Sequence, residues 1–435
     1  MSGIVTARLS TEFSADELSR IRADFPILSE VVNGHELVYL DSGATAEHPS
    51  QVIQAEIEFV EHRMAAVHRG AHTLAAEATE EFEGARERVA AFIGARPEEL
   101  VWTSNATEAI NLVAYSIGNA SAGRGGSAAE RFRIGPGDEI LTTELEHHAN
   151  LIPWQELAAR TGATLRIVPL DDEGRLRLDL VDGLLSDRTR IFAFTHVSNV
   201  LGTIHPVKEL AAKAHAVGAL VVLDACQSVP HMPVDVKDLD VDFAAFSGHK
   251  MLGPTGIGAL YGRRELLEAL PPFLTGGSMI TTVTLEGAEF LPPPQKFEAG
   301  TQRVSQVVAL GAAVDYLQGV GMDRIHAHEA ALGHRLVEGL RQIDGVRILG
   351  PVEDVERVGL AAIDVPGIHA HDLGQYLDGL GIAIRVGHHC AQPLHRRLGV
   401  NASTRASTYL YTRPEEVDAY LEALPRAIDY FRSFA

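Results

Sequence analysis

Between residues 139 and 270, short apolar segments alternate with longer amphipathic ones. The short segments have the length of buried strands, and the longer ones repeat with a helical period. This alternation favours a mostly parallel sheet that is covered by helices on both faces. The predicted strands are 139–143, 164–169, 190–195, 220–224, 243–246 and 258–261, and the predicted helices are 151–161, 178–185, 206–217 and 264–270.

Polar side chains stand where predicted strands end, including a further strand at 100–103. Ligands of such sheets bind at the carboxyl ends of the strands. One polar residue there says little, but five strand ends that each deliver polar groups predict a site. These groups are Ser104 to Thr107, Glu146 to Asn150, His196 with Asn199, Asp224 with Gln227, and Ser247 with His249 and Lys250.

Lys250 follows the apolar strand 243–246 and precedes a glycine-rich turn. Loss of solvent lowers the pKa of a lysine and frees its amine to attack a carbonyl. Ser247 and His249 flank it and can donate hydrogen bonds to an anion such as a phosphate. Residues 104–107 open a helix, whose N-terminal amides also attract anions. Taken singly, these features are better explained by a surface lysine and by simple helix capping.

Asp224 ends a buried strand, where a carboxylate is costly without a partner. A protonated ring nitrogen is such a partner, and this pairing makes pyridoxal phosphate an electron sink. With Lys250 as the attached amine, the constellation predicts a pyridoxal phosphate site. Asn199 and Gln227 can then bond the ring hydroxyl, and His147 can lie on the ring face.

The composition is that of a globular protein, with 46% hydrophobic and 22% charged residues. A net charge of −21 argues against nucleic acid or an anionic membrane as the main partner. No apolar run approaches the length of a membrane span, and residues 1–14 lack the apolar core of a secretory signal. The two cysteines make no disulfide framework. We therefore expect a cytoplasmic protein.

The pattern changes after about residue 294, where two long helices lead into an α+β segment. The sequence predicts a large domain over 31–295, and a smaller domain that combines 1–30 with 296–435. Ser14 and Glu17 have the spacing of a capping box and predict a helix from residue 15. Residues 119–137 are rich in Gly, Ala and Ser and predict a flexible surface loop.

Cys390 is close in sequence to His388, His389 and Arg385. Cationic surroundings lower the pKa of a thiol and favour the nucleophilic thiolate. The alternatives are a buried small apolar residue and a zinc site. Adjacent ligands make poor zinc geometry and no fourth ligand is evident nearby, so we predict no metal site. Cys226 is interpreted as structural.

Several segments together resemble one family. The chain resembles the class V aminotransferase group of fold-type I pyridoxal-phosphate enzymes and, more closely, the SUF-type (group II) cysteine desulfurases. The resemblance extends over nearly the whole chain and implies a mostly parallel seven-stranded sheet in the large domain, a smaller α+β domain and a homodimer. The segments that carry it are 66–70, 146–150, 195–202, 247–250, 297–301, 385–391 and 405–407.

The resemblance also implies a role for each site residue. The catalytic residues are Lys250, His147 and the nucleophile Cys390. The cofactor site comprises Ala106, Thr107, His147, Asn199, Asp224, Gln227, Ser247, His249, Lys250 and Thr301, with Thr301 reaching in from the other subunit. The substrate site comprises His68, Asn199, Arg385 and Arg405. His68 is interpreted equally well as an ordinary histidine with its hydrogen bonds formed and no role in the site. Gln302 stands where the family usually has proline.

The implied activity is conversion of L-cysteine to L-alanine with a Cys390 persulfide. A SufE- or SufU-type acceptor then takes the sulfur for iron–sulfur cluster assembly. Related alternatives are a selenocysteine lyase, a C–S lyase of the same fold, and a class V aminotransferase or epimerase in which Cys390 has no role. A binding module that kept only the fold would be expected to have lost Lys250 or Asp224, and both are present.

Overall fold

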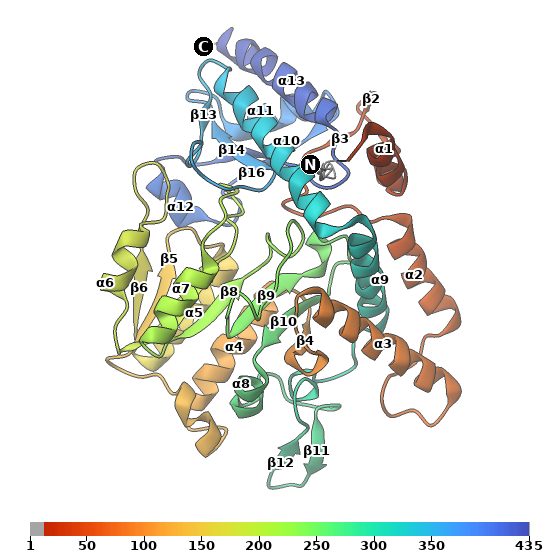
Figure 1. The fold of residues 1–435 in the computed structure, drawn as a ribbon, viewed down its shortest axis with the longest axis vertical. Coiled ribbons are helices and arrows are strands. Elements are labelled where there is room, and N and C mark those ends of the chain that lie inside the picture. Colours follow the sequence, from red (N-terminus) through yellow and green to blue (C-terminus); the bar gives the residue numbers. More distant parts are fainter. Residues whose placement is uncertain (1–12, 435) are drawn as a thin grey trace, which may run out of the picture.

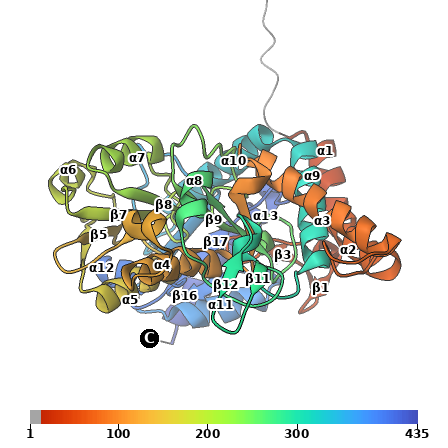
Figure 2. The ribbon, with the colours of Figure 1, turned by 90° about the horizontal axis from the view of Figure 1, so that it is seen from below.

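The computed structural model describes residues 13–434 (Figures 1 and 2). Its central sheet has seven strands in the order β4-β10-β9-β8-β7-β5-β6. β10 runs antiparallel to β4 and β9, and the pairs from β9 to β6 are parallel, so the predicted mostly parallel sheet is confirmed. The strands are β4 Leu100–Thr103, β5 Glu139–Thr143, β6 Thr164–Val168, β7 Thr189–Thr195, β8 Leu220–Asp224, β9 Phe243–Ser247 and β10 Gly258–Gly262.

Successive residues of each central strand bury opposite faces of the sheet. On β7, Phe192 and Phe194 pack with α3, α7 and α9, whereas Ile191 and Ala193 pack with α4 and α5. Each large apolar side chain buried in this way contributes about 1.5–3 kcal/mol. The covering helices are α2 Ser50–His62, α3 Thr73–Phe92, α7 Val207–Ala216 and α9 Val304–Val320 on one side, with α4 Ala106–Ser121, α5 Ile152–Thr161 and α8 Arg264–Ala269 on the other; α6 is Val181–Leu184.

A second, antiparallel sheet lies above the first in Figure 1, in the order β13-β14-β17-β16. Its outer face packs against three helices around Leu336, Leu373 and Leu424. Its elements are α10 Met322–Arg341, β13 Arg347–Ile348, β14 Leu360–Asp364, α11 Ala370–Asp378, β16 Arg385–Gly387, α12 Gln392–Arg397, β17 Ser403–Ser407 and α13 Pro414–Arg432. Three short pairs complete the strands: β1 Val31–Val32 with β2 His35–Glu36, β3 Val38–Tyr39 with β15 Ile382–Ala383, and β11 Ile280–Val283 with β12 Ala288–Phe290.

The N-terminal helix α1 (Ala15–Ala23) joins the second sheet's unit. The Ser14 hydroxyl accepts the Glu17 N–H and the Glu17 carboxylate accepts the Ser14 N–H, which confirms the capping box. Arg22 forms a 2.9 Å ion pair with Glu416 of α13. Because α9 packs with α2 and α3 in the large core, we propose that the boundary between the two domains lies near residue 321 rather than residue 295.

The expected flexible loop over 119–137 is wrong in part. α4 continues to Ser121, and a 3-10 helix spans Ser127–Phe132. Ala129 and Phe132 are buried in the core formed with α4, so two apolar side chains anchor a segment whose composition is otherwise that of a loop. Within residues 13–434, no helix combines the length and the apolar character needed to cross a bilayer.

Candidate active site

A single cavity opens where the central strands end, between the large sheet and the second sheet. It contains every residue that the resemblance assigns to the site except His68 and Thr301. These residues are Ala106, Thr107, His147, Asn199, Asp224, Gln227, Ser247, His249, Lys250, Arg385, Cys390 and Arg405. Parallel strands end at one edge of the sheet, so residues far apart in the chain meet there.

The N-terminus of α4 forms an anion cup in this cavity. Asn105 caps the helix through its side-chain oxygen, which accepts the Glu108 N–H at 3.0 Å. Ser247 Oγ accepts the Ala106 N–H at 2.9 Å, which leaves the Ser247 hydroxyl hydrogen free to donate. Helix amides and the helix dipole favour a phosphate at such a place. His249 lies beside it, with Nδ1 3.3 Å from Thr45 Oγ1.

Asp224 is buried at the end of β8, and its carboxylate can accept a further hydrogen bond. Its Oδ1 accepts the Cys226 N–H at 3.0 Å, which leaves Oδ2 for another donor. The neighbouring Cys226 thiol is 3.8 Å from Ser247 Oγ. Burial raises the pKa of Cys226 to about 12, so this thiol stays protonated at neutral pH. Cys226 nevertheless lines the cavity, so its interpretation as structural stays a prediction.

A chain of contacts fixes the orientation of the Gln227 amide. Its nitrogen donates to the Gly43 carbonyl at 2.8 Å, and its oxygen lies 3.2 Å from His231 Nε2. The other ring nitrogen of His231 is 2.8 Å from the Glu329 carboxylate. Since the amide oxygen can only accept, His231 donates to it and the Gln227 N–H groups face the Gly43 side.

His147 follows β5 and is neutral in this structure. Its Nδ1 accepts the Ala149 N–H at 3.0 Å, so the ring hydrogen is on Nε2. Burial, reinforced by the charge of Lys250, lowers the pKa of His147 to about 4. The preceding Glu146 is fully buried, with hydrogen bonds of 2.6 Å to Thr143 and Asn150 that hold the turn. The cavity thus receives a fixed, uncharged imidazole.

Arg405 on β17 has one N–H donor without a hydrogen-bond partner among residues 13–434. Nη1 donates to the Asn199 carbonyl at 2.8 Å and Nη2 pairs with Asp41 at 3.2 Å, while buried Nε has no partner among residues 13–434. Burial lowers the pKa of Arg405 to about 10, which still leaves it charged at neutral pH. A buried guanidinium with unused N–H groups suits a small carboxylate.

Cys390 is in the loop between β16 and α12. The Asn199 side chain donates to the His389 carbonyl at 2.7 Å, and the His148 N–H donates to the Cys390 carbonyl at 2.7 Å. Burial, followed by the charge of Arg405, lowers the pKa of His389 to about 2. Burial keeps the His389 ring neutral, so His389 does not contribute to the cationic surroundings expected for Cys390. The positive charge at this end of the cavity comes from Arg405 and Arg385.

No three His, Cys, Asp or Glu side chains within the described part of the chain are arranged to hold a metal ion. The alternative of a zinc site at His388, His389 and Cys390 therefore has no geometric support.

Comparison with known proteins agrees with this chemistry. The family model for class V aminotransferases matches residues 38–420. The probable cysteine desulfurase 2 of Mycobacterium leprae (strain TN) is 56% identical over 417 residues, covering 95% of this chain and 97% of that protein. The cysteine desulfurase of Cronobacter sakazakii is 47% identical over 411 residues, covering 94% and 98%. The chain belongs to the class V aminotransferases and, among them, to the cysteine desulfurase family.

Solved structures of this family have the same fold. The apo cysteine desulfurase of Thermococcus onnurineus NA1 superposes with a TM-score of 0.87 at 40% identity, over 94% of this chain and 98% of that one. The cysteine desulfurase CsdA of Escherichia coli gives a TM-score of 0.85 at 38% identity, over 95% and 98%.

Enzymes of the class V aminotransferase family use pyridoxal 5′-phosphate, and the cavity fits that cofactor. Lys250 offers the amine, and the free oxygen of Asp224 suits a ring nitrogen. The α4 amides with Ser247 suit the phosphate. This chain is a pyridoxal-phosphate enzyme of the family.

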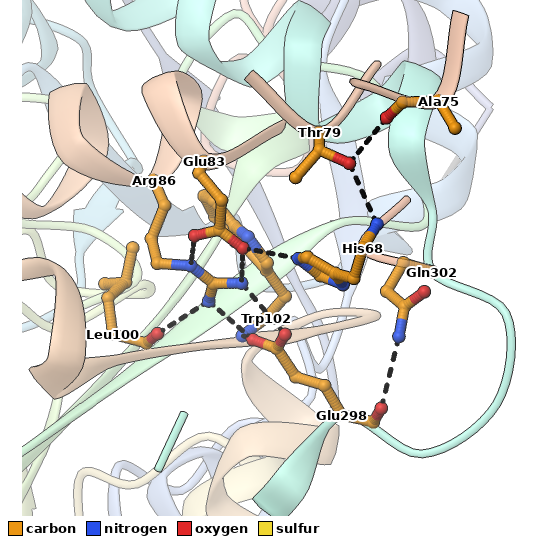
Figure 3. Close-up of polar contacts among 9 residues, drawn as sticks. All are labelled: His68, Ala75, Thr79, Glu83, Arg86, Leu100, Trp102, Glu298 and Gln302. Atoms are coloured by element: carbon orange, nitrogen blue, oxygen red, sulfur yellow. Dashed lines mark hydrogen bonds and ion pairs between the residues drawn. The ribbon is translucent and has the colours of Figure 1, made fainter. Parts of the chain in front are cut away.

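Two residues assigned by resemblance, His68 and Thr301, lie outside the cavity. His68 Nε2 is 2.7 Å from Glu83, which in turn contacts Arg86 on the same helix (Figure 3). Arg86 is buried and forms a bidentate pair with Glu298 at 2.6 and 2.9 Å. Glu298 thus anchors the segment that leads to exposed Thr301. Their assignment to a partner's site stays a prediction.

The structure also moves one residue out of the predicted site. His196 lines a separate groove with Met232 and Met322, because side chains alternate along β7 and its neighbours Thr195 and Val197 face the cavity. Sequence reasoning missed Gly43 and Ala44, which line the cavity, and Asp41, which pairs with Arg405. Their signal was the Asp-Ser-Gly-Ala-Thr turn directly after a strand.

Proposed function

We propose that the protein is a desulfurase that converts L-cysteine to L-alanine and keeps the sulfur as a persulfide on Cys390. The observation that carries the proposal is that one cavity holds Lys250, Asp224, Arg405 and Cys390. An amine, a ring-nitrogen partner, a carboxylate clamp and a thiol are the groups that this reaction requires. The names of the relatives, which are cysteine desulfurases, support the same substrate.

The proposal gives a defined task to Lys250, Arg405 and His147 of the cavity. When bound, pyridoxal phosphate supplies an aldehyde for amines and a ring that withdraws electrons from the substrate Cα. The substrate amine would replace the Lys250 amine at the cofactor aldehyde, and Lys250 would then move the proton of the substrate Cα. Arg405 binds the substrate carboxylate through its unused N–H groups. His147, with its hydrogen on Nε2, stays an uncharged hydrogen-bond donor at neutral pH.

Cys390 performs the sulfur transfer. Its thiolate attacks the sulfur of the substrate and a new S–S bond forms. The Cβ–S bond breaks with its electron pair left on carbon, and a proton later replaces sulfur at Cβ, which gives L-alanine. The sulfur leaves the substrate as the terminal atom of a Cys390 persulfide, so no external oxidant or reductant takes part.

The active unit in this proposal is a homodimer. α2 and the residues just after it expose an apolar stripe that repeats at helical spacing, with Ile53, Ile57, Val60 and Met64 between 41% and 55% exposed. A contiguous apolar stripe on a surface helix is typical of an interaction face. A second copy is the occupant that the resemblance implies, and the same contact would bring His68 and Thr301 near the partner's cavity.

The final acceptor in this proposal is a SufE- or SufU-type protein that carries the sulfur to iron–sulfur cluster assembly. The cysteine loop is short and bonded at both the His389 and Cys390 carbonyls, so it cannot carry the persulfide far from the cavity. A dedicated acceptor that comes to the loop fits this arrangement. Adding such an acceptor should raise the steady rate of alanine release.

The proposal is tested by measuring alanine released from L-cysteine by the holoenzyme, with wild type beside Cys390→Ala. We expect release by wild type and loss in the variant, whose cofactor absorbance should be unchanged. Equal release by both proteins would contradict the proposal and would favour a C–S lyase. Selenocysteine turnover that survives in Cys390→Ala would instead indicate a selenocysteine lyase.

A further inference from the structure

The cysteine loop, residues 388–391, has a backbone that needs outside support. His389 and Cys390 have φ angles of 50° and 56°, so two consecutive residues with side chains are in the left-handed region. That region is disfavoured for such residues. The loop's own preferences therefore do not select this conformation, and neighbouring elements must hold it.

Two buried residues beyond the loop provide such support. His395 of α12 and Ser403 of β17 are both 0% exposed, and neither lines the cavity. His395 Nδ1 lies 2.9 Å from the Ala391 carbonyl, and its Nε2 lies 2.9 Å from Ser403 Oγ. Ser403 Oγ is also 2.9 Å from His389 Nε2. A continuous relay thus connects His389 with Ala391, on either side of Cys390.

The chemistry of each partner fixes the direction of every hydrogen bond in the relay. A carbonyl only accepts, so His395 Nδ1 carries a hydrogen. Burial lowers the pKa of His395, so its ring is neutral and Nε2 accepts the Ser403 hydroxyl hydrogen. Ser403 Oγ then accepts from His389 Nε2. The one ring hydrogen of neutral His389 is therefore on Nε2, and buried Nδ1 remains a bare acceptor without a partner among residues 13–434.

We propose that His395 and Ser403 are positioning residues that hold His389 in one tautomer and the loop in the conformation that presents Cys390 to the cavity. This inference rests on the proposed function, in which Cys390 is the nucleophile. The relay keeps His389 uncharged and bonded away from Cys390, so the imidazole neither donates a proton to the thiolate nor leaves the loop free to relax.

The test compares Ser403→Ala, His395→Asn and the double variant as holoenzymes. His395→Asn keeps a donor at the Nδ1 position for the Ala391 carbonyl and loses the bond to Ser403. Two quantities are measured: the rate at which iodoacetamide alkylates Cys390, located by peptide mass spectrometry, and the rate of alanine release. We expect each single variant to change alkylation and to slow alanine release by about tenfold, the effect of losing about one buried hydrogen bond.

The double variant separates a relay from general loss of packing. Both single changes break the same relay, so the double variant should be no slower than the slower single one. Ser403→Thr, which keeps the hydroxyl, should retain wild-type rates. Ser116→Ala is the matched control, because Ser116 is equally buried and its hydroxyl has no partner in the described part of the chain.

Three results would overturn the proposal: wild-type rates in both single variants, a double variant whose losses multiply, or an equal loss in Ser116→Ala. The alkylation rate also separates this proposal from the proposed function. If wild type releases no alanine, yet the variants change Cys390 alkylation as expected, the assigned reaction fails while the positioning role stands.

Discussion

Arg405→Lys tests the carboxylate clamp while preserving the positive charge. Arg405 is 1% exposed, and two of its guanidinium nitrogens already bind the Asn199 carbonyl and Asp41 at 2.8 and 3.2 Å. A lysine ammonium is a point donor and cannot reproduce the planar fork that serves these partners and a ligand together. The variant keeps a cation beside Asp41, so no carboxylate is left unpaired.

The magnitude follows from the hydrogen bonds that the substrate loses. A hydrogen bond to a charged group contributes about 1.5–3 kcal/mol, so losing one lowers kcat/KM by about 10- to 150-fold. The substrate carboxylate is held both before and during the reaction, and the loss should therefore fall mainly on KM. Initial rates of alanine release over a range of L-cysteine concentrations measure both constants.

The matched control is Arg357→Lys. Arg357 is a half-buried arginine outside the cavity, so its replacement should leave KM unchanged. Cofactor absorbance should be the same in both variants. An unchanged KM in Arg405→Lys, or an equal rise in Arg357→Lys, would refute the assignment of Arg405 to the substrate carboxylate.

Three further predictions follow from the same geometry. Asp224→Asn should weaken cofactor binding and lower activity by at least tenfold, because the cofactor's ring nitrogen loses its charged partner. Tight cofactor binding in equilibrium dialysis, together with full activity, would count against that pairing. Burial lowers the pKa values of His147, His205 and His249 to about 4, so the unfolded chain binds more protons than the folded one between about pH 6.5 and 4. The melting temperature should therefore fall as the pH falls through this window. An equal or higher melting temperature at pH 5 than at pH 7.5 would contradict this prediction. Ile57→Glu with Val60→Glu should halve the mass seen by sedimentation, whereas Leu180→Glu, a change at another exposed apolar residue, should leave it unchanged; an unaltered mass in the double variant would remove α2 from the interface.

Local patterns in the sequence were enough to predict the large sheet. In each strand, apolar residues either alternate with polar ones or follow one another without interruption. The capping box of Ser14 and Glu17 is also a short-range signal, and the structure reproduces it. The end of a parallel strand is also a local signal, which is why Lys250, Asp224 and Ser247 could be placed together in advance.

Features that depend on side-chain direction or on distant contacts were not predictable in this way. His196 follows the same strand as Asn199, but the alternation of β7 turns its ring to the opposite face. Charge near Cys390 was expected from adjacent histidines, yet burial makes His389 neutral. The relay from His395 through Ser403 joins residues on a helix and a strand, and only the packing of the second sheet against the loop brings them together.

The most direct test of this account is to locate the sulfur after a single reaction cycle. The holoenzyme is incubated with L-cysteine without a reducing thiol, and its peptides are examined by mass spectrometry for one added sulfur atom. We predict that the added sulfur is on the Cys390 peptide and that the Cys226 peptide is unmodified, since the Cys226 thiol stays protonated. Alanine formed with no sulfur on Cys390, or sulfur found on Cys226 instead, would contradict the central claim.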